Sequence, residues 1–387
     1  MLRTRSNKHP SRRFVFANWR VGAIWLAIFF SVLAIGAFLF AWSGLYSVAA
    51  SRGHWPGFNL VLEFGMRSSV RTHALGIEIP NLEDQALIER GAGHFQGGCA
   101  PCHGAPGKAP SPIVRAMLPV PPDLGASVHT WKANELFWIV KHGLKYTGMP
   151  AWAAQERDDE VWAVVAFLQR LRQTSPAEYQ ALANLEPRQQ DVPIRALAQG
   201  GPVGTGLAAC SRCHGLDGAG RESGAFPRLD IQTADYLFTQ LETYVVGTRH
   251  SGIMQPVAAE LEAAEMRRLA EYYSAQRSPQ KQTSPAGDEP LRAMGQMLAT
   301  AGLPDEGIPP CMSCHAEDPA SRDPLYPAIA GQYANYTSQQ LELFKSGKRR
   351  ATPAGEIMTV LAQRLTSEQI KALSLYLAEL PPPQADR

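Results

Sequence analysis

The hydrophobic pattern divides the chain into one long apolar run near the N-terminus and a series of short amphipathic segments after it. Residues 21–42 contain no charged side chain, and at a rise of about 1.5 Å per residue such a helix spans a hydrocarbon core of roughly 30 Å. Downstream, apolar residues recur at intervals of three and four, which predicts amphipathic helices. The two clearest stripes are Val161, Val164, Val165, Leu168 and Leu171, and Ile370, Leu373, Leu377 and Leu380. Strand patterns are essentially missing, so we predict an all-α fold.

The apolar run has the flanks of a membrane anchor. Six basic residues and no acidic residue precede position 51, while aromatic rings lie at its edges (Trp19, Trp42 and Tyr46). By the positive-inside rule, residues 1–20 stay in the cytoplasm, residues 21–42 form the single transmembrane anchor, and the rest is exported. The alternative is a signal peptide cleaved near Val48-Ala49-Ala50, but signal peptides usually have apolar cores of about 7–15 residues. We therefore expect an uncleaved anchor, followed by an interfacial or docking segment over residues 43–82.

Charge excludes one class of partner. The formal net charge is +2, and because the N-terminal segment holds six of the basic residues, the remainder is slightly acidic. No long basic run interleaved with aromatic residues follows the anchor, so nucleic acid is not an expected partner.

All six cysteines fall into three copies of C-x-x-C-H, the pattern of c-type haem attachment. On a helical turn, residues i, i+3 and i+4 share one face. Two thiols can then form thioethers with the vinyl groups of a haem while the adjacent imidazole binds the iron. We therefore predict three covalently bound haem c groups. The copies are Cys99, Cys102 and His103; Cys210, Cys213 and His214; and Cys311, Cys314 and His315.

Three other uses of a C-x-x-C pair fit less well. A zinc site needs a second pair within about 20 residues, whereas the next cysteine after Cys102 is Cys210. A thioredoxin-like motif needs a βαβ context, which this helical pattern does not offer. Structural disulfides suit an exported protein but give no reason for the three following histidines.

The motif recurs after 111 and then 101 residues, which indicates a tandem array. Each unit has a short helix, the C-x-x-C-H motif, an irregular loop and a closing amphipathic helix. Thr366 and Gln369 form a capping box for the last closing helix, which ends at Pro381. The predicted modules are residues 83–175, 196–277 and 290–380, separated by a segment 174–195 that breaks the helical pattern and a Pro- and Ser-rich linker 277–290.

Each module offers a methionine at a similar distance beyond its histidine. Met149, Met254 and Met358 lie 46, 40 and 43 residues beyond His103, His214 and His315, each in a predicted loop before the closing helix. A thioether is a soft, neutral ligand that raises the reduction potential of haem iron and favours electron transfer. A lone methionine is usually core filler, but the repeated offset predicts that these three are axial ligands. His129, His142 and His250 are the rival ligands.

On these motifs, the chain after residue 82 resembles the class I cytochromes c, and its last two modules resemble the dihaem cytochrome c4 family. The second resemblance is carried by 226–229 with 236–241, and by 326–333 with 340–347. It implies small all-α modules in which the carbonyls of Pro227 and Pro327 accept a hydrogen bond from the proximal histidine, with Pro122 as their counterpart in the first module. The whole arrangement is similar to membrane-anchored cytochromes that serve terminal oxidases, and to three-haem subunits of membrane-bound dehydrogenases.

The expected function is electron relay without substrate chemistry. No nucleophile with a base, phosphate-binding loop or carboxylate pair is present, so we assign no catalytic residue and no enzyme activity. The expected partners are respiratory components in the bacterial cytoplasmic membrane, a terminal haem-copper oxidase or a quinol or dehydrogenase donor, with the modules in the periplasm. The alternatives are an electron-accepting dehydrogenase subunit or a haem peroxidase, which would need an open iron site. Lys141, Lys145 and the basic residues 345–350 could steer an acidic partner.

Overall fold

The computed structural model describes residues 12–49, 51–53, 57–183, 202–221, 223–276, 278, 289–316 and 322–383. Residues 1–11 of the basic N-terminus, most of the linker 277–290, residues 184–195 of the first linker and residues 196–201 of the second predicted module lie outside this part. The chain forms two compact units, residues 1–56 and 57–387. The regular elements of the described residues are all helices, with two isolated β-bridges and no strand, which confirms the all-α prediction.

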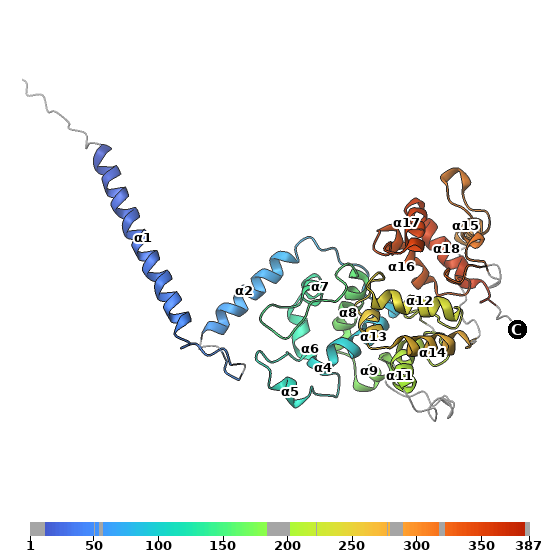
Figure 1. Cartoon of the computed structure of the whole chain (residues 1–387), viewed down its shortest axis with the longest axis horizontal. Helices are drawn as coiled ribbons and strands as arrows, with labels where there is room; N and C mark the ends of the chain where they lie inside the picture. The colour runs from blue at the N-terminus through green and yellow to red at the C-terminus, as the bar shows by residue number, and fades with distance from the viewer. Residues whose placement is uncertain are drawn as a thin grey trace, which may run out of the picture. The chain divides into compact units, whose positions relative to one another are not determined.

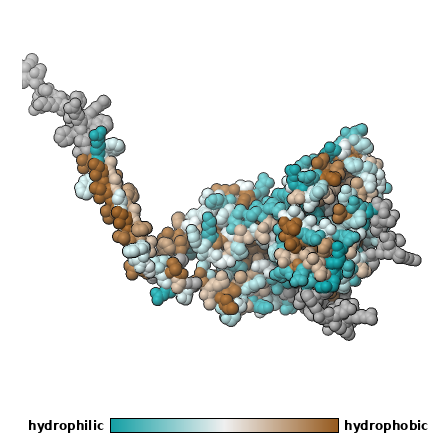
Figure 2. Space-filling model, in the orientation of Figure 1, coloured by the Kyte–Doolittle hydropathy of each residue, from teal (hydrophilic) through white to brown (hydrophobic). Residues whose placement is uncertain are grey.

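The first unit contains one long apolar helix, α1 (Arg12–Trp42). Residues 19–42 are long and apolar enough to cross a membrane, and none of that stretch is buried within the protein. Its surface is almost continuously hydrophobic (Figure 2). Trp19, Trp25 and Trp42 each expose more than 65% of their side-chain area, a degree of exposure that suits lipid rather than water.

The second unit begins with α2 (Phe58–His73), whose two halves have different surroundings. Val70 and Ala74 are buried, and Asn134 donates a hydrogen bond to the carbonyl of Ala74 at 2.9 Å. The first two turns instead expose large apolar side chains, Leu60 at 71% and Phe64 at 74%. Only the C-terminal half of α2 is therefore part of the folded core.

Three groups of helices follow, each with its own hydrophobic core and one C-x-x-C-H motif. Figure 1 shows them in chain order, coloured from cyan to red. The first group contains α3 (Gln85–His94), η1 (Phe95–Cys99), α4 (Ala100–His103), α5 (Pro112–Arg115), α6 (Leu124–Ser127), η2 (Val128–Thr130), α7 (Ala133–His142), α8 (Asp158–Leu171) and α9 (Pro176–Leu182). The second contains α11 (Pro202–His214), α12 (Ala234–Val245), α13 (Met254–Ala259) and α14 (Ala263–Ser274). The third contains α15 (Glu289–Thr300), η3 (Pro304–Glu306), η4 (Cys311–Ser313), α16 (Ala334–Lys345), α17 (Pro353–Arg364) and α18 (Ser367–Glu379).

The opening and closing helices of the first and third groups cross at a glycine. A Cβ at Gly91 would lie 1.9 Å from the carbonyl oxygen of Ala163, and a Cβ at Gly295 would lie 2.3 Å from that of Ala372. Any larger residue would push the helices apart, so glycine fixes the close crossing of α3 with α8 and of α15 with α18. The predicted apolar stripe on α8, from Val161 to Leu171, is buried, as expected for a helix that packs closely against its neighbours.

One prediction about helices needs correction. The segment 174–195 was expected to break the helical pattern, but Ser175 caps the short helix α9, whose Tyr179 packs edge-on against Phe95. The third group has the predicted opening helix, α15. In that group the helix ends at Thr300, eleven residues before Cys311, because Gly302 adopts a left-handed conformation (φ 71°) that helical residues do not adopt.

Candidate functional site

The three C-x-x-C-H motifs lie at the ends of opening helices or on short turns. In the first group α3, η1 and α4 run on without a break, so Cys99, Cys102 and His103 share a nearly continuous helix. In the second, the motif forms the last turn of α11. In the third, Cys311 starts the 3₁₀ turn η4. The six cysteines form no disulfide with one another, as thioether bonds to haem require.

Each motif histidine is held by a proline carbonyl. The Nδ1–H group donates from His103 to Pro122 at 2.9 Å, from His214 to Pro227 at 3.1 Å and from His315 to Pro327 at 2.8 Å. These three hydrogen bonds confirm the ones that the family resemblance implied. They require the Nδ1–H tautomer, so Nε2 keeps its lone pair and is free to bind a metal ion.

The motif cysteines and histidines lie in buried surroundings that favour their uncharged forms. Burial raises the pKa of the Cys99 thiol to about 12 and that of the Cys210 and Cys311 thiols to about 11. Burial also lowers the pKa of His214 and His315. No cluster of three or more potential ligands for an ion forms among the residues that the structure describes.

The second and third groups share one large cavity of about 1090 Å³. It brings together the motif residues and the predicted methionines of both groups, as well as residues of α3 from the first group. Haem fits this cavity, because its lining combines paired thiols, an imidazole with Nδ1 already bonded, a thioether and mostly apolar side chains. The lining residues in question are Cys210, Cys213, His214, Met254, Cys311, Cys314, His315 and Met358.

The predicted axial methionines occupy three different local structures. Met149 lies in the loop between α7 and α8, as predicted, whereas Met254 starts α13 and Met358 lies inside α17. The prediction that all three are in loops is therefore wrong for two of them. Thr352 caps α17, and Pro353 in its first turn has the φ value that a helix needs, so the chain becomes helical before it reaches Met358.

The rival histidines have other surroundings. His250 lies 2.7 Å from the carboxylate of Glu156, and His142 packs beside Trp138. His129 is exposed. The basic residues are also partly occupied. Lys141 and Lys348 both pair with Asp158, and the pair made by Lys348 links the third group to the first.

Two glutamines link the second group to the third. Gln232 donates to the carbonyl of Ala328 and accepts from its amide, both at 2.9 Å. Gln332 bonds in the same way to the carbonyl and amide of Arg228, at 3.1 and 3.0 Å. Ala328 and Arg228 directly follow Pro327 and Pro227, the two prolines that hold the motif histidines.

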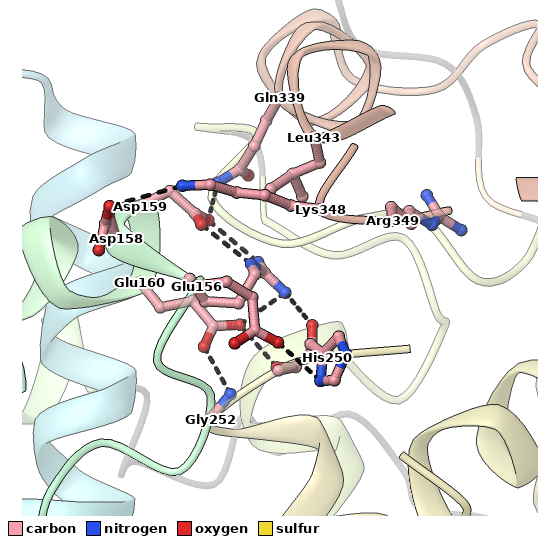
Figure 3. Close-up of polar contacts among 12 residues, drawn as sticks. Glu156, Asp158, Asp159, Glu160, His250, Gly252, Gln339, Leu343, Lys348 and Arg349 are labelled. Atoms are coloured by element: carbon pink, nitrogen blue, oxygen red, sulfur yellow. Dashed lines mark hydrogen bonds and ion pairs between the residues drawn. The ribbon is translucent and has the colours of Figure 1, made fainter. Parts of the chain in front are cut away.

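The start of α8 links the first group to the other two (Figure 3). Arg157 donates hydrogen bonds to the carboxylate of Asp159 and to the carbonyl of His250 in the second group. It also forms an ion pair with Glu160 at 3.0 Å. Gln339 of the third group donates to Asp159. These residues could not be identified from the sequence, because acidic residues are common in the first turn of any helix. The two glutamines could not be identified either, because contacts between modules leave no periodic pattern.

The chain is similar to known cytochromes over two parts of its length. Residues 86–168 match the family described as cytochrome c oxidase, cbb3-type, subunit III, and residues 308–381 match the family described as cytochrome c. The thiosulfate dehydrogenase electron acceptor of Thiomonas intermedia is 34% identical over 174 residues, which are 45% of this chain and 79% of that protein. Cytochrome c4 of Azotobacter vinelandii is 32% identical over 46% of this chain and 88% of its own length. The crystal structure of reduced cytochrome c4 from Pseudomonas stutzeri covers 47% of this chain and 100% of its own, at 31% identity and a TM-score of 0.39.

Proposed function

The chain belongs to the class I c-type cytochromes, with modules like those of the dihaem cytochrome c4 family, and on this premise we propose that it is a membrane-anchored three-haem electron relay. The observation that supports three haem groups is the hydrogen bond from each of the three motif histidines to a proline carbonyl. The middle group has this bond and a cavity-lining methionine, as the third group does.

The roles of the residues follow from their chemistry. The pairs Cys99 and Cys102, Cys210 and Cys213, and Cys311 and Cys314 attach the three haems. His103, His214 and His315 would hold the irons through Nε2, and Met149, Met254 and Met358 would supply the second protein ligand to each. Bound haem iron supplies the one-electron couple, and the thioether ligands raise its potential. With two protein ligands to each iron, the bound haems would offer no open position to a substrate, so we assign electron transfer to the chain and no reaction of its own.

Two electron partners have support. The match of the first group to a subunit of cbb3-type oxidase supports delivery to a terminal haem-copper oxidase. A relative named as an electron acceptor of thiosulfate dehydrogenase supports the second candidate, an electron-accepting subunit of a dehydrogenase. Membranes that contain the oxidase but no dehydrogenase distinguish them: the first proposal requires rapid oxidation of the reduced protein there, and slow oxidation favours the second.

The membrane location rests on α1 and α2. Helix α1 is long enough to serve as an uncleaved anchor in the bacterial cytoplasmic membrane, with the three modules in the periplasm. The exposed apolar turns of α2 begin 16 residues after the end of α1, and we assign them to the lipid–water interface. This is the role expected for the segment 43–82.

Mass spectrometry of the mature protein is the direct test. The proposal requires a mass that includes residues 1–50 and three haem groups. A carbon monoxide titration of the reduced protein adds the second criterion, since closed irons bind little. Two haems per chain would mean that one of the three motifs carries no haem. One carbon monoxide bound per chain would favour the peroxidase alternative.

A further inference from the structure

The third helical residue of each closing helix carries a carboxylate or an amide. In the second and third modules this side chain folds back to cap its own helix. Glu265 accepts from the amide of Glu262 at 3.0 Å, and Gln369 accepts from that of Thr366 at 2.7 Å. These are capping boxes.

In the first module the equivalent residue, Glu160, contacts the second module instead. Its carboxylate accepts from the hydroxyl of Ser251 at 2.6 Å and from the amide of Gly252 at 2.6 Å. It also accepts from the indole of Trp152, three residues after Met149, at 3.1 Å. Arg157 lies 3.0 Å from it and neutralises its charge. Only 3% of Glu160 is exposed, so this carboxylate is buried and fully bonded, as burial of a charge requires.

Ser251 connects Glu160 to the methionine of the second module. The oxygen that donates its proton to Glu160 accepts from the amide of Met254 at 3.0 Å and from that of Ile253 at 3.3 Å. The amide of Ser251 in turn donates to Gln255 at 2.9 Å. A hydroxyl that donates to a carboxylate is a better acceptor, because bonds in such a chain polarise one another. Glu160 of the first module therefore helps to hold the start of α13, and with it Met254, in the second module.

We infer that Glu160 of the first module is a positioning residue for Met254, the axial ligand of the second haem, so that contact between the two modules helps to set the potential of that haem. This inference rests on the proposed function, because it takes Met254 as a ligand. The first and second modules are then coupled through this chain of hydrogen bonds. The second haem has its full potential only while the first module is in place.

The substitution Glu160→Gln tests this in the full-length protein with its haems attached. It keeps the size of the side chain but weakens its bonds to Ser251 and Gly252. Ser251→Ala removes the other end of the same chain of hydrogen bonds. Glu135→Gln is the matched control, since Glu135 is also a buried carboxylate of the first module and accepts from the amide of Lys132 at 2.9 Å. Met254→Ala identifies which redox wave belongs to the second haem.

We expect Glu160→Gln and Ser251→Ala to favour the oxidised form of the second haem about tenfold, a fall of about 59 mV for a one-electron couple, and to weaken the charge-transfer absorption between methionine sulfur and ferric iron. The other two waves, and all three waves of Glu135→Gln, should stay in place. If Met254→Ala moves one wave but both test variants leave it unchanged, this inference is wrong while the proposed ligands stand. If Met254→Ala moves no wave, the proposed ligand is wrong and the inference fails with it.

Discussion

Gln232 and Gln332 make the same pair of hydrogen bonds in opposite directions across the interface between the second and third modules. Each glutamine binds the residue that directly follows the partner module's histidine-binding proline. The positions of the two motif histidines therefore depend on the interface between the modules.

Truncation of either glutamine should destabilise this interface. Gln232→Ala leaves the buried amide and carbonyl of Ala328 without their partners, which costs about 1–3 kcal/mol. Gln332→Ala should cost a similar amount at Arg228. Denaturant unfolding measures both, with the exposed Gln173→Ala as a control that should stay within about 0.5 kcal/mol. Equal stabilities of all three variants would mean that the reciprocal bonds contribute little.

Acid should weaken the protein through His94. This residue of α3 is 6% exposed, and its Nδ1 has no hydrogen-bond partner in the part of the chain that the structure describes. Burial, with help from the charges of Arg90 and Arg157, lowers its pKa from 6.5 to about 3. Below pH 6.5 the unfolded chain therefore binds a proton that the folded protein does not. The contribution of neutral His94 to the free energy of unfolding is fully present above pH 6.5 and is lost as the pH decreases towards 3.

The size of the effect follows from linkage. At pH 5 the loss is about 2 kcal/mol, at about 1.4 kcal/mol per pH unit. His94→Gln should remove this part of the loss, so the difference in unfolding free energy between pH 7 and pH 5 should shrink by that amount. His129→Gln, which changes an exposed histidine, should retain the steeper dependence. Parallel pH profiles for His94→Gln and the unchanged protein would contradict the argument.

Local signals in the sequence predicted many of the helices. The stripe from Val161 to Leu171 and the capping box of Thr366 depend on residues only a few positions apart, so they could be identified directly. The extra helix α17 was missed, because Thr352 and Pro353 were not considered as a helix start. Glu160 could not be assigned, since Glu265 has the same place in its helix and a different partner. Whether such a carboxylate caps its own helix or holds another module depends on packing between modules, which leaves no periodic signal.

The ion pairs at the start of α8 should be important for stability. Arg157 is 11% exposed and lies between Asp159 and Glu160, at 2.9 and 3.0 Å. Its burial alone would lower its pKa, but the two carboxylates raise it above its usual value. Arg157→Gln leaves both acids close together without their cation, and we expect a loss of about 3–5 kcal/mol.

A surface pair provides the comparison for Arg157. Arg267 pairs with Asp235 at 2.7 Å, with side chains 39% and 66% exposed. Arg267→Gln should cost less than about 1 kcal/mol, because solvent screens exposed ion pairs. Denaturant unfolding of the two variants measures the difference. Similar losses in both would mean that the pairs of Arg157 are no stronger than a surface ion pair.

The apolar half of α2 should bind membranes by itself. Leu60 and Phe64 expose 71% and 74% of their area, and burial of such side chains in an apolar phase contributes about 1.5–3 kcal/mol each. In a version whose residues 1–50 are replaced by a cleaved signal peptide, Leu60→Ser combined with Phe64→Ser should reduce flotation with phospholipid vesicles at least tenfold. Ile113→Ser changes a side chain that is 82% exposed on α5 and should leave flotation unchanged. If the double variant floats as well as the unchanged version, α2 has no role at the bilayer, and α1 alone holds the relay to the membrane.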